Sequence, residues 1–174
     1  MKSRATQIKY IVIHCQAGHG NMSSMMEYWR SIGWKSPGYN IWIDYDGTVY
    51  NLSDYEKVTN GVKGFNPGCI NICYRGGVDK NNHNKAIDTR TDEQKYALKQ
   101  EITNVLKWLK SNGKDISKDL MILGHRDFSP DKNNNGVIES NERIKECPCF
   151  DAISEYGYLL GRIENQVLPS NRKK

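Results

Sequence analysis

Three side chains that can bind zinc stand in two distant parts of the sequence. His14 ends an apolar run over residues 11–13, and His125 follows another apolar run. Cys147 comes later, two residues after Lys145. Two imidazoles and one thiolate form a three-ligand zinc site with an open fourth position, which is the catalytic form, because structural sites use four protein ligands. These residue types predict a catalytic zinc site, provided that the fold brings the segments together.

The four histidines differ in how well their surroundings suit metal binding. His14 and His125 each follow a strand-like run, so both are expected at one edge of a sheet, where sites of α/β proteins gather. For each of them taken alone, a hydrogen-bonded structural histidine is the alternative. His83 lies in an asparagine-rich loop and His19 between two glycines. We expect both of these on exposed loops rather than at the metal.

Five cysteines cannot all pair within one chain. Cys69 and Cys73 lie in an apolar run, on the same face of an expected strand, which favours buried free thiols. Cys15 follows the first histidine directly, and Cys149 lies two residues after Cys147. The spacing leaves three roles open for this second pair: support of the metal ligands, replacement of a ligand, or a disulfide.

A second metal-binding pattern lies between His125 and Cys147. Residues 131–142 match the calcium-loop sequence D-x-[DN]-x-[DN]-G-x5-E, with Gly136 at the sharp turn and Ile138 at the usual apolar position. The expected calcium ligands are Asp131, Asn133, Asn135, the carbonyl of Val137, Glu139 through a water, and Glu142. The alternative is an ordinary asparagine- and glycine-rich surface loop. Two asparagines in place of carboxylates predict a modest Kd, roughly 10⁻⁴ to 10⁻³ M.

The strands that must carry these side chains can be read from apolar patterns. β-Branched and aromatic runs predict five strands, at residues 9–13, 39–43, 48–52, 69–75 and 120–123. Asp46 and Gly47 separate the second and third runs and are typical of a hairpin turn. His14 and His125 come at the ends of the first and last runs, so a shared site requires those two strands to lie close together.

Three helices are expected between and after the strands. A capping box of Ser24 and Glu27 would begin the first, and one of Thr91 and Gln94 would begin the second. A third is expected from about residue 151 to 162. The expected buried side chains are Met25, Tyr28, Trp29 and Ile32 in the first helix and Leu98, Ile102, Val105, Leu106 and Leu109 in the second.

Length and composition fit a single domain over residues 1–174. Strands mixed with helices and a hairpin predict an α/β fold, with a central mixed β-sheet flanked by helices. The net charge of +5 suits an anionic polymer, but the basic residues are dispersed and no nucleic-acid readout motif occurs. No run approaches the roughly 20 apolar residues of a membrane span, and the first residues do not form a signal peptide. We expect neither a nucleic-acid partner nor membrane insertion.

A set of short motifs, in fixed order along the chain, resembles one known family. The motifs are Ile13-His14-Cys15, Gly38-Tyr39 with Asp46-Gly47-Thr48-Val49, Lys63-Gly64-Phe65-Asn66, Gly76-Gly77-Val78-Asp79, Gly124-His125-Arg126-Asp127 and Lys145-Glu146-Cys147-Pro148. Together they are similar to the zinc-dependent N-acetylmuramoyl-L-alanine amidases of the type-2 class, which include amidase-type phage lysozymes and peptidoglycan recognition proteins. The resemblance spans roughly residues 8–160.

The resemblance implies a metal, a reaction and five site residues. It makes His14, His125 and Cys147 the zinc ligands, and it places Tyr39 and Lys145 at the family's two catalytic polar positions. It implies hydrolysis of the amide between N-acetylmuramic acid and L-alanine in peptidoglycan. The residue types suit this reaction, because zinc brings the pKa of water towards about 7 and acts as a Lewis acid. A lysine and a tyrosine can stabilise the developing oxyanion.

Two places depart from the family's pattern. Asn40 follows Tyr39 where close relatives often carry histidine, and Asn60 and Gly61 stand where some phage relatives place one. Contacts to substrate are expected to differ there, whereas the zinc ligands and the catalytic pair are unaffected.

The resemblance favours a monomeric phage or prophage endolysin, made in the host cytoplasm and acting on the cell wall after release. An antibacterial effector or a cytosolic recycling enzyme would have a similar sequence. The main alternative from another class is a recognition module that binds peptidoglycan without cutting it. Such relatives usually lose the ligand cysteine, and this chain keeps Cys147.

Overall fold

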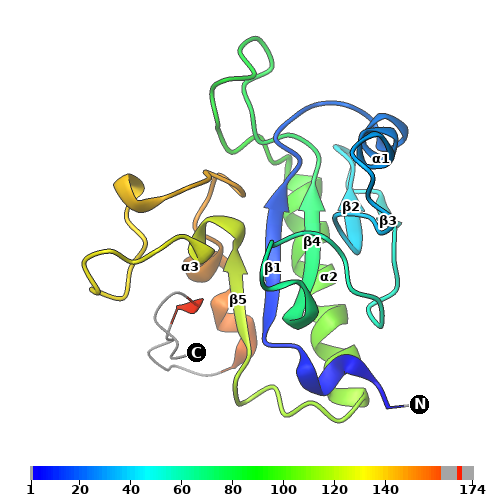
Figure 1. Cartoon of the computed structure of the whole chain (residues 1–174), viewed down its shortest axis with the longest axis vertical. Helices are drawn as coiled ribbons and strands as arrows, with labels where there is room; N and C mark the ends of the chain where they lie inside the picture. The colour runs from blue at the N-terminus through cyan, green and yellow to red at the C-terminus, as the bar shows by residue number, and fades with distance from the viewer. Residues whose placement is uncertain (1, 162–167, 170–174) are drawn as a thin grey trace.

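The sheet places the ends of its central strands at one edge of the molecule. The computed structural model describes residues 2–161 and 168–169, and Figure 1 shows the sheet between its helices. Five strands follow the order β3-β2-β4-β1-β5, with β3 antiparallel to β2 and the other neighbours parallel. The strands are β1 (Tyr10–Cys15), β2 (Ile41–Ile43), β3 (Val49–Asn51), β4 (Cys69–Tyr74) and β5 (Met121–Gly124). The predicted α/β fold with a central mixed sheet is confirmed.

Register explains why two distant histidines can meet. β1 and β4 are buried along their whole length, as continuous apolar runs in a parallel sheet should be. Ile13 of β1 lies beside Gly124 of β5, and His14 lies beside Cys73 of β4. Because β1 and β5 are parallel neighbours, the residues that follow both strands emerge at the same edge of the sheet.

The helix α2 (Asp92–Ser111) covers one face of the sheet. Thr91 and Gln94 form the predicted capping box, in which each side chain accepts a hydrogen bond from the other residue's backbone N–H. All five residues of the predicted apolar stripe are buried. They pack against the isoleucines that β1, β2 and β4 direct to this face. The larger part of the hydrophobic core therefore lies between α2 and the sheet.

The opposite face is covered by loops and by the helix α1 (Met22–Ser31). Phe65 from a loop and Phe128 from the 3-10 turn after β5 pack over Tyr10, Val12 and neighbouring strand residues. At the β2 side, two buried and two partly buried residues of α1 pack with Trp42 and Cys73. This face also carries His14, because residues two apart in a strand share a face and His14 follows Tyr10 and Val12 at that spacing along β1.

The first helix differs from its prediction. Its N-cap is Asn21, whose side chain accepts a hydrogen bond from Ser24 N at 2.9 Å, so the predicted Ser24–Glu27 capping box is wrong. Only Met25 and Trp29 are buried, whereas 61% of Tyr28 and 46% of Ile32 are exposed. The helix lies at the edge of the sheet, so it has a narrower buried side than a helix across a sheet face.

The last helix is shorter than predicted. α3 (Ala152–Tyr156) begins after an N-cap at Asp151, and a 3-10 turn follows over Gly157–Leu160. Gly161 then adopts φ +70°, which ends the helical segment. The predicted end at Arg162 lies outside the described residues.

Candidate metal centre and pocket

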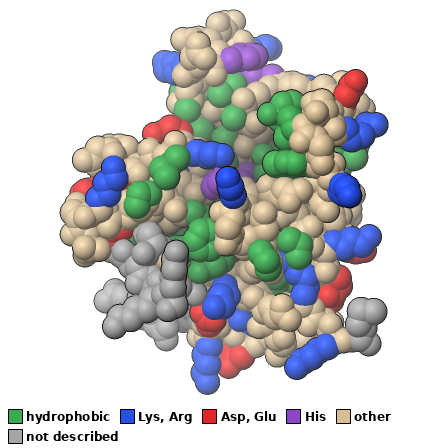
Figure 2. Space-filling model, viewed as in Figure 1, with side chains coloured by type: hydrophobic (Ala, Val, Ile, Leu, Met, Phe, Trp, Pro, Cys, Tyr) green, Lys and Arg blue, Asp and Glu red, His purple; other side chains and the backbone are tan. Residues whose placement is uncertain are grey.

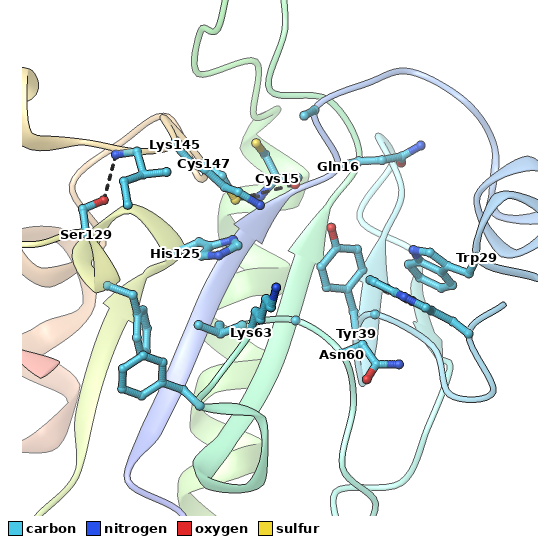
Figure 3. Close-up of a pocket in the computed structure, with 18 residues that line it drawn as sticks. Cys15, Gln16, Trp29, Tyr39, Asn60, Lys63, His125, Ser129, Lys145 and Cys147 are labelled. Atoms are coloured by element: carbon cyan, nitrogen blue, oxygen red, sulfur yellow. Dashed lines mark hydrogen bonds between the residues drawn. The ribbon is translucent and has the colours of Figure 1, made fainter. Parts of the chain in front are cut away.

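The three predicted zinc ligands meet at the carboxyl ends of β1 and β5. His14 is the last residue but one of β1, His125 begins the 3-10 turn that follows β5, and Cys147 lies on the loop before α3. Their ligand atoms all lie within 4.8 Å of one another, and Cys147 Sγ lies 3.8 Å from His14 Nδ1. Figure 3 shows His125 and Cys147 over the end of the strand that carries His14.

The separation of Cys147 Sγ from His14 Nδ1, 3.8 Å, is close to the value in a tetrahedral zinc site. Zinc–nitrogen bonds of about 2.0 Å and zinc–sulfur bonds of about 2.3 Å require a nitrogen–sulfur separation near 3.5 Å. Backbone contacts hold the thiol in place: Arg126 N donates to Cys147 O at 2.7 Å, and Cys15 N donates to Cys147 Sγ at 3.2 Å.

Both histidines are neutral at physiological pH. Burial and the electrostatic interaction with His125 lower the pKa of His14 well below its usual value, against the opposing effect of its hydrogen bond to the amide oxygen of Asn71. Burial, followed by the charge of Lys145, lowers the pKa of His125 to about 4. A neutral imidazole has a free lone pair, so both residues are in the state that binds a metal.

A pocket of about 680 Å³ opens beside the three ligands. Figure 2 shows histidine atoms at the floor of a hollow on this face, with basic side chains close by. The aromatic side chains that line the pocket are Trp29, Trp34, Tyr39, Phe65 and Phe128. Its polar lining includes Asn60, Lys63, Ser129 and Lys145. Apolar walls with a few polar groups are typical of ligand sites.

Tyr39 and Lys145 both reach this pocket. The ring of Tyr39 lies 5.1 Å from that of His14, measured between centroids. Burial, together with nearby thiols, raises the pKa of Tyr39 well above its usual value, so the hydroxyl keeps its proton. Lys145 is exposed, and its charge acts on both histidines, lowering the pKa of each. The structure therefore brings together all five residues that the sequence singled out for zinc chemistry.

The remaining cysteines are free thiols. Cys69 and Cys73 are buried, as predicted. The sulfurs of Cys15 and Cys149 lie 3.9 Å apart, too far for a disulfide bond. Cys149 donates its S–H to the carbonyl of Gly77 at 3.2 Å, whereas the backbone of Cys15 donates to the ligand sulfur. Of the three roles left open for this pair, support of the metal ligands describes Cys15.

The other two histidines lie away from the three ligands. His83 is exposed, as predicted. His19 is half-buried rather than exposed, because Tyr45 OH hydrogen-bonds its Nδ1 and the carbonyl of Val78 accepts from its Nε2 at 2.8 Å. With both ring nitrogens engaged, His19 has a structural role.

The predicted calcium loop is a well-formed turn. Asp131 and Glu142 are buried, and Ile138 packs into the core under the loop. Asp131 accepts a hydrogen bond from Gly136 N at 2.8 Å, and Gly136 adopts φ +84°. Glu142 accepts from backbone N–H groups at both ends of the loop. Three expected ligands, Asn133, Asn135 and Glu139, are exposed, as is Val137.

The sequence reading missed the residues behind His14. Asn71 Oδ1 lies 2.8 Å from His14 Nε2, and Asn71 is itself bonded to Thr59 at 2.8 Å. A signal was present, because Asn71 is a polar residue between two isoleucines of the strand expected at residues 69–75. A buried amide needs a hydrogen-bond partner.

Comparison with known proteins identifies relatives over most of the chain. The family model described as N-acetylmuramoyl-L-alanine amidase matches residues 4–148. The endolysin of Enterobacteria phage K11 is 29% identical over 143 residues, which cover 80% of this chain and 79% of that protein.

Solved structures show the same fold. The amidase LysC from Clostridium intestinale superposes with a TM-score of 0.61 at 19% identity, over 91% of this chain and 89% of that one. Drosophila PGRP-LB gives a TM-score of 0.61 at 18% identity, over 86% and 81%. Within the described residues, no helix is both long enough and apolar enough to cross a membrane.

Proposed function

The chain belongs to the N-acetylmuramoyl-L-alanine amidase family, and we propose that it is a zinc-dependent hydrolase of peptidoglycan. The bond that we propose it cuts joins the lactyl group of N-acetylmuramic acid to L-alanine of the stem peptide. The observation that carries this proposal is the meeting of His14, His125 and Cys147 at one edge of the sheet. Three ligands of these types leave one tetrahedral position open, as a hydrolytic zinc site requires.

The protein's own groups have separate tasks in this reaction. Zinc, when bound, would act as a Lewis acid and activate water. Lys145, which lines the pocket, would place its cation near the carbonyl oxygen and stabilise the negative charge that develops there. Tyr39 keeps its proton because burial raises its pKa, so its hydroxyl would donate a hydrogen bond to the same oxygen or to the attacking water.

The pocket also suits a peptidoglycan strand. The rings of Trp29 and Trp34 are stacked, with centroids 6.2 Å apart, and form an apolar wall for the sugar or peptide. Lys63 and Lys145 add positive charge, which complements the carboxylates of a stem peptide. The relatedness to a phage endolysin supports action on the cell wall after release from the host cytoplasm, and we propose that the enzyme acts as a monomer.

Residues 131–142 are proposed to bind Ca²⁺ as well as to connect the zinc ligands. Support comes from the complete loop motif and from the burial of Asp131 and Glu142 at its two ends. The loop joins His125 to Cys147, so an ion there would stiffen the segment that positions the third zinc ligand.

A peptidoglycan-binding module without catalysis is the alternative function. Its support is the fold shared with the peptidoglycan recognition proteins LCa and LCx, whose structure contains bound tracheal cytotoxin. The amidase proposal is preferred because the chain keeps a complete set of three ligand side chains next to a lysine and a tyrosine.

Mass spectrometry of muropeptides released from purified sacculi tests the proposal. The zinc-loaded protein should release stem peptides with a free L-alanine amine and leave the glycan strands intact. A zinc chelator or Cys147→Ser should abolish release, while Cys147→Ser protein should still bind the wall. Binding by the zinc-loaded wild type without any amide cleavage would favour the recognition module, and products from another bond would overturn the assigned specificity.

A further inference from the structure

Four buried polar side chains form a relay that begins at His14. Nε2 of His14 lies 2.8 Å from Oδ1 of Asn71 on β4. Asn71 Nδ2 donates to Thr59 Oγ1 at 2.8 Å, and the Thr59 hydroxyl donates to Asn40 Oδ1 at 3.1 Å. Exposure is 1% for His14 and 0% for Asn71, Thr59 and Asn40. These four residues, called the polar relay below, must therefore satisfy one another.

The far end of the relay fixes the orientation of the first amide. Asn40 Nδ2 donates to the backbone carbonyl of Asp54 at 3.0 Å and to that of Lys57 at 3.4 Å. A carbonyl only accepts hydrogen bonds, so the NH₂ group of Asn40 must face these residues. Its Oδ1 then faces the other way, where it accepts from Asn71 N at 3.0 Å and from Thr59.

This orientation passes along the relay to the histidine. The single hydroxyl proton of Thr59 is donated to Asn40, so Thr59 Oγ1 must accept from the NH₂ group of Asn71. Asn71 therefore presents its oxygen to His14. Because that oxygen only accepts, His14 must carry its proton on Nε2. Its Nδ1 is left with a free lone pair, 3.8 Å from the sulfur of Cys147.

Close packing keeps Asn71 in this position. A Cβ atom on Gly61 would lie 2.3 Å from Asn71 Cγ and 2.6 Å from its Nδ2. Real Cβ atoms do not approach so closely, so Gly61 leaves the space that the amide occupies. Asn71 sits on a central strand, between two paired neighbours, and so cannot shift without disturbing the sheet.

We propose that Asn71, oriented by Thr59 and Asn40, is a positioning residue that sets the tautomer of His14 and so aims Nδ1 at the zinc ion. This inference rests on the proposed function. Hydrogen-bond partners of metal-binding histidines commonly fix the ring and raise metal affinity, and their loss typically costs 10- to 100-fold in affinity. Here the orientation of the amides is fixed by the backbone carbonyls of Asp54 and Lys57. These two residues lie on a loop that is distant in sequence from every proposed zinc ligand.

The tautomer can be measured directly, in the absence of metal and of substrate. Long-range ¹H–¹⁵N spectra of the metal-free protein should show His14 protonated on Nε2. Asn71→Leu, which removes the acceptor at similar size, should bring out the Nδ1-protonated form. Thr59→Val should do so in part, because the Asn71 amide is then free to turn its NH₂ group towards His14. Asn71→Asp keeps an acceptor and should keep the wild-type tautomer.

Zinc affinity gives the second readout, by competition with a chromophoric chelator. Asn71→Leu should weaken zinc binding by about 10- to 100-fold, Thr59→Val by less, and Asn71→Asp should stay close to wild type. Gln94→Leu is the matched control. Gln94 is also fully buried and donates to two backbone carbonyls, but those carbonyls belong to Ile43 and Arg75, which are not part of the polar relay. It should lower stability without changing the tautomer or the zinc affinity.

Two results would overturn the inference. One is Nδ1 protonation of His14 in the metal-free wild type. The other is a folded Thr59→Val or Asn71→Leu protein whose tautomer and zinc affinity equal those of wild type. If Asn71→Leu does not fold, Thr59→Val decides. Failure here is distinct from failure of the proposed function, because the muropeptide assay on the wild type does not depend on the relay.

Discussion

At the scale of single residues, burial keeps both histidines neutral, whereas Lys145 beside them is exposed. Burial lowers the pKa of His14 well below its usual value and that of His125 to about 4. Both rings are therefore ready for a cation at neutral pH. Lys145 is exposed at the rim of the same pocket. Its charge opposes protonation of both histidines, and the same charge is the one that we propose stabilises the oxyanion.

Replacing Lys145 tests its role in stabilising the reaction's negative charge. Lys145→Met should lower kcat/KM by about 10²- to 10³-fold, the usual effect of removing a group that stabilises an oxyanion. Zinc content should not fall, because Lys145 is not a ligand. Kinetics on a soluble muropeptide and metal analysis would measure both.

Lys107→Met is the control, because it removes the same charge from an exposed position on α2. An equal loss in both variants would mean that overall charge matters and that the position of Lys145 does not.

At the scale of elements, Arg90 ties the start of α2 to α3. Its guanidinium donates to Asp88 and to Glu155, in each case at 2.9 Å, and its Cζ lies 3.3 Å from the centre of the Phe150 ring. The Arg90 side chain is only 2% exposed. α3 packs on β5, the strand that leads to His125. These contacts of Arg90, called the Arg90 clasp below, therefore support the segment that carries a proposed zinc ligand.

The Arg90 clasp predicts a specific loss of stability in acid. Hydrogen bonds from Arg90 lower the pKa of Glu155, and they lower that of Asp88 although burial opposes this. A depressed folded-state pKa adds stability above the unfolded pKa, near 4, and this stability is lost as the pH falls further. Arg90→Gln should therefore destabilise by about 2 kcal/mol at pH 7, and by much less near pH 2.

Urea unfolding at both pH values measures the effect. A difference between wild type and Arg90→Gln that is the same at pH 7 and pH 2 would show that the two carboxylates do not take part.

At the scale of the whole molecule, the proposed zinc site joins segments that only the sheet order brings together. β1 lies between β4 and β5, so the first strand of the chain and the last become neighbours. The loop with the calcium motif then returns the chain to the same place and delivers Cys147. Metal binding should therefore stabilise the complete fold, because the ligands are gathered only in the folded state.

The Tm of the protein, measured with and without each metal, tests that coupling. Free zinc at 100 times its Kd should add about 2.7 kcal/mol, which for a chain of this size raises Tm by roughly 5–10 °C. Calcium added in the millimolar range to zinc-loaded protein should raise Tm further, and Glu142→Gln should remove that second increase. If chelating calcium alone, with zinc retained, alters neither Tm nor activity, the calcium proposal is wrong.

Local sequence patterns determined the elements and the chemistry of this protein. Continuous apolar runs predicted buried strands, a hairpin turn followed from Asp46-Gly47, and the Thr91–Gln94 capping box began α2 where expected. These signals act between residues that are near one another in the chain, so they can be read without a fold. The family motifs likewise pointed to His14, His125 and Cys147 before any geometry was known.

Only the tertiary structure decided which polar groups meet. Asn40 and Gly61 stand out in the sequence as departures from a family pattern, yet the fold makes one an end of the polar relay and the other the space for Asn71. The same holds for Tyr28, exposed because α1 lies at the sheet edge. Hydrogen bonds and burial across strands depend on register and packing between distant segments, and no local pattern encodes those.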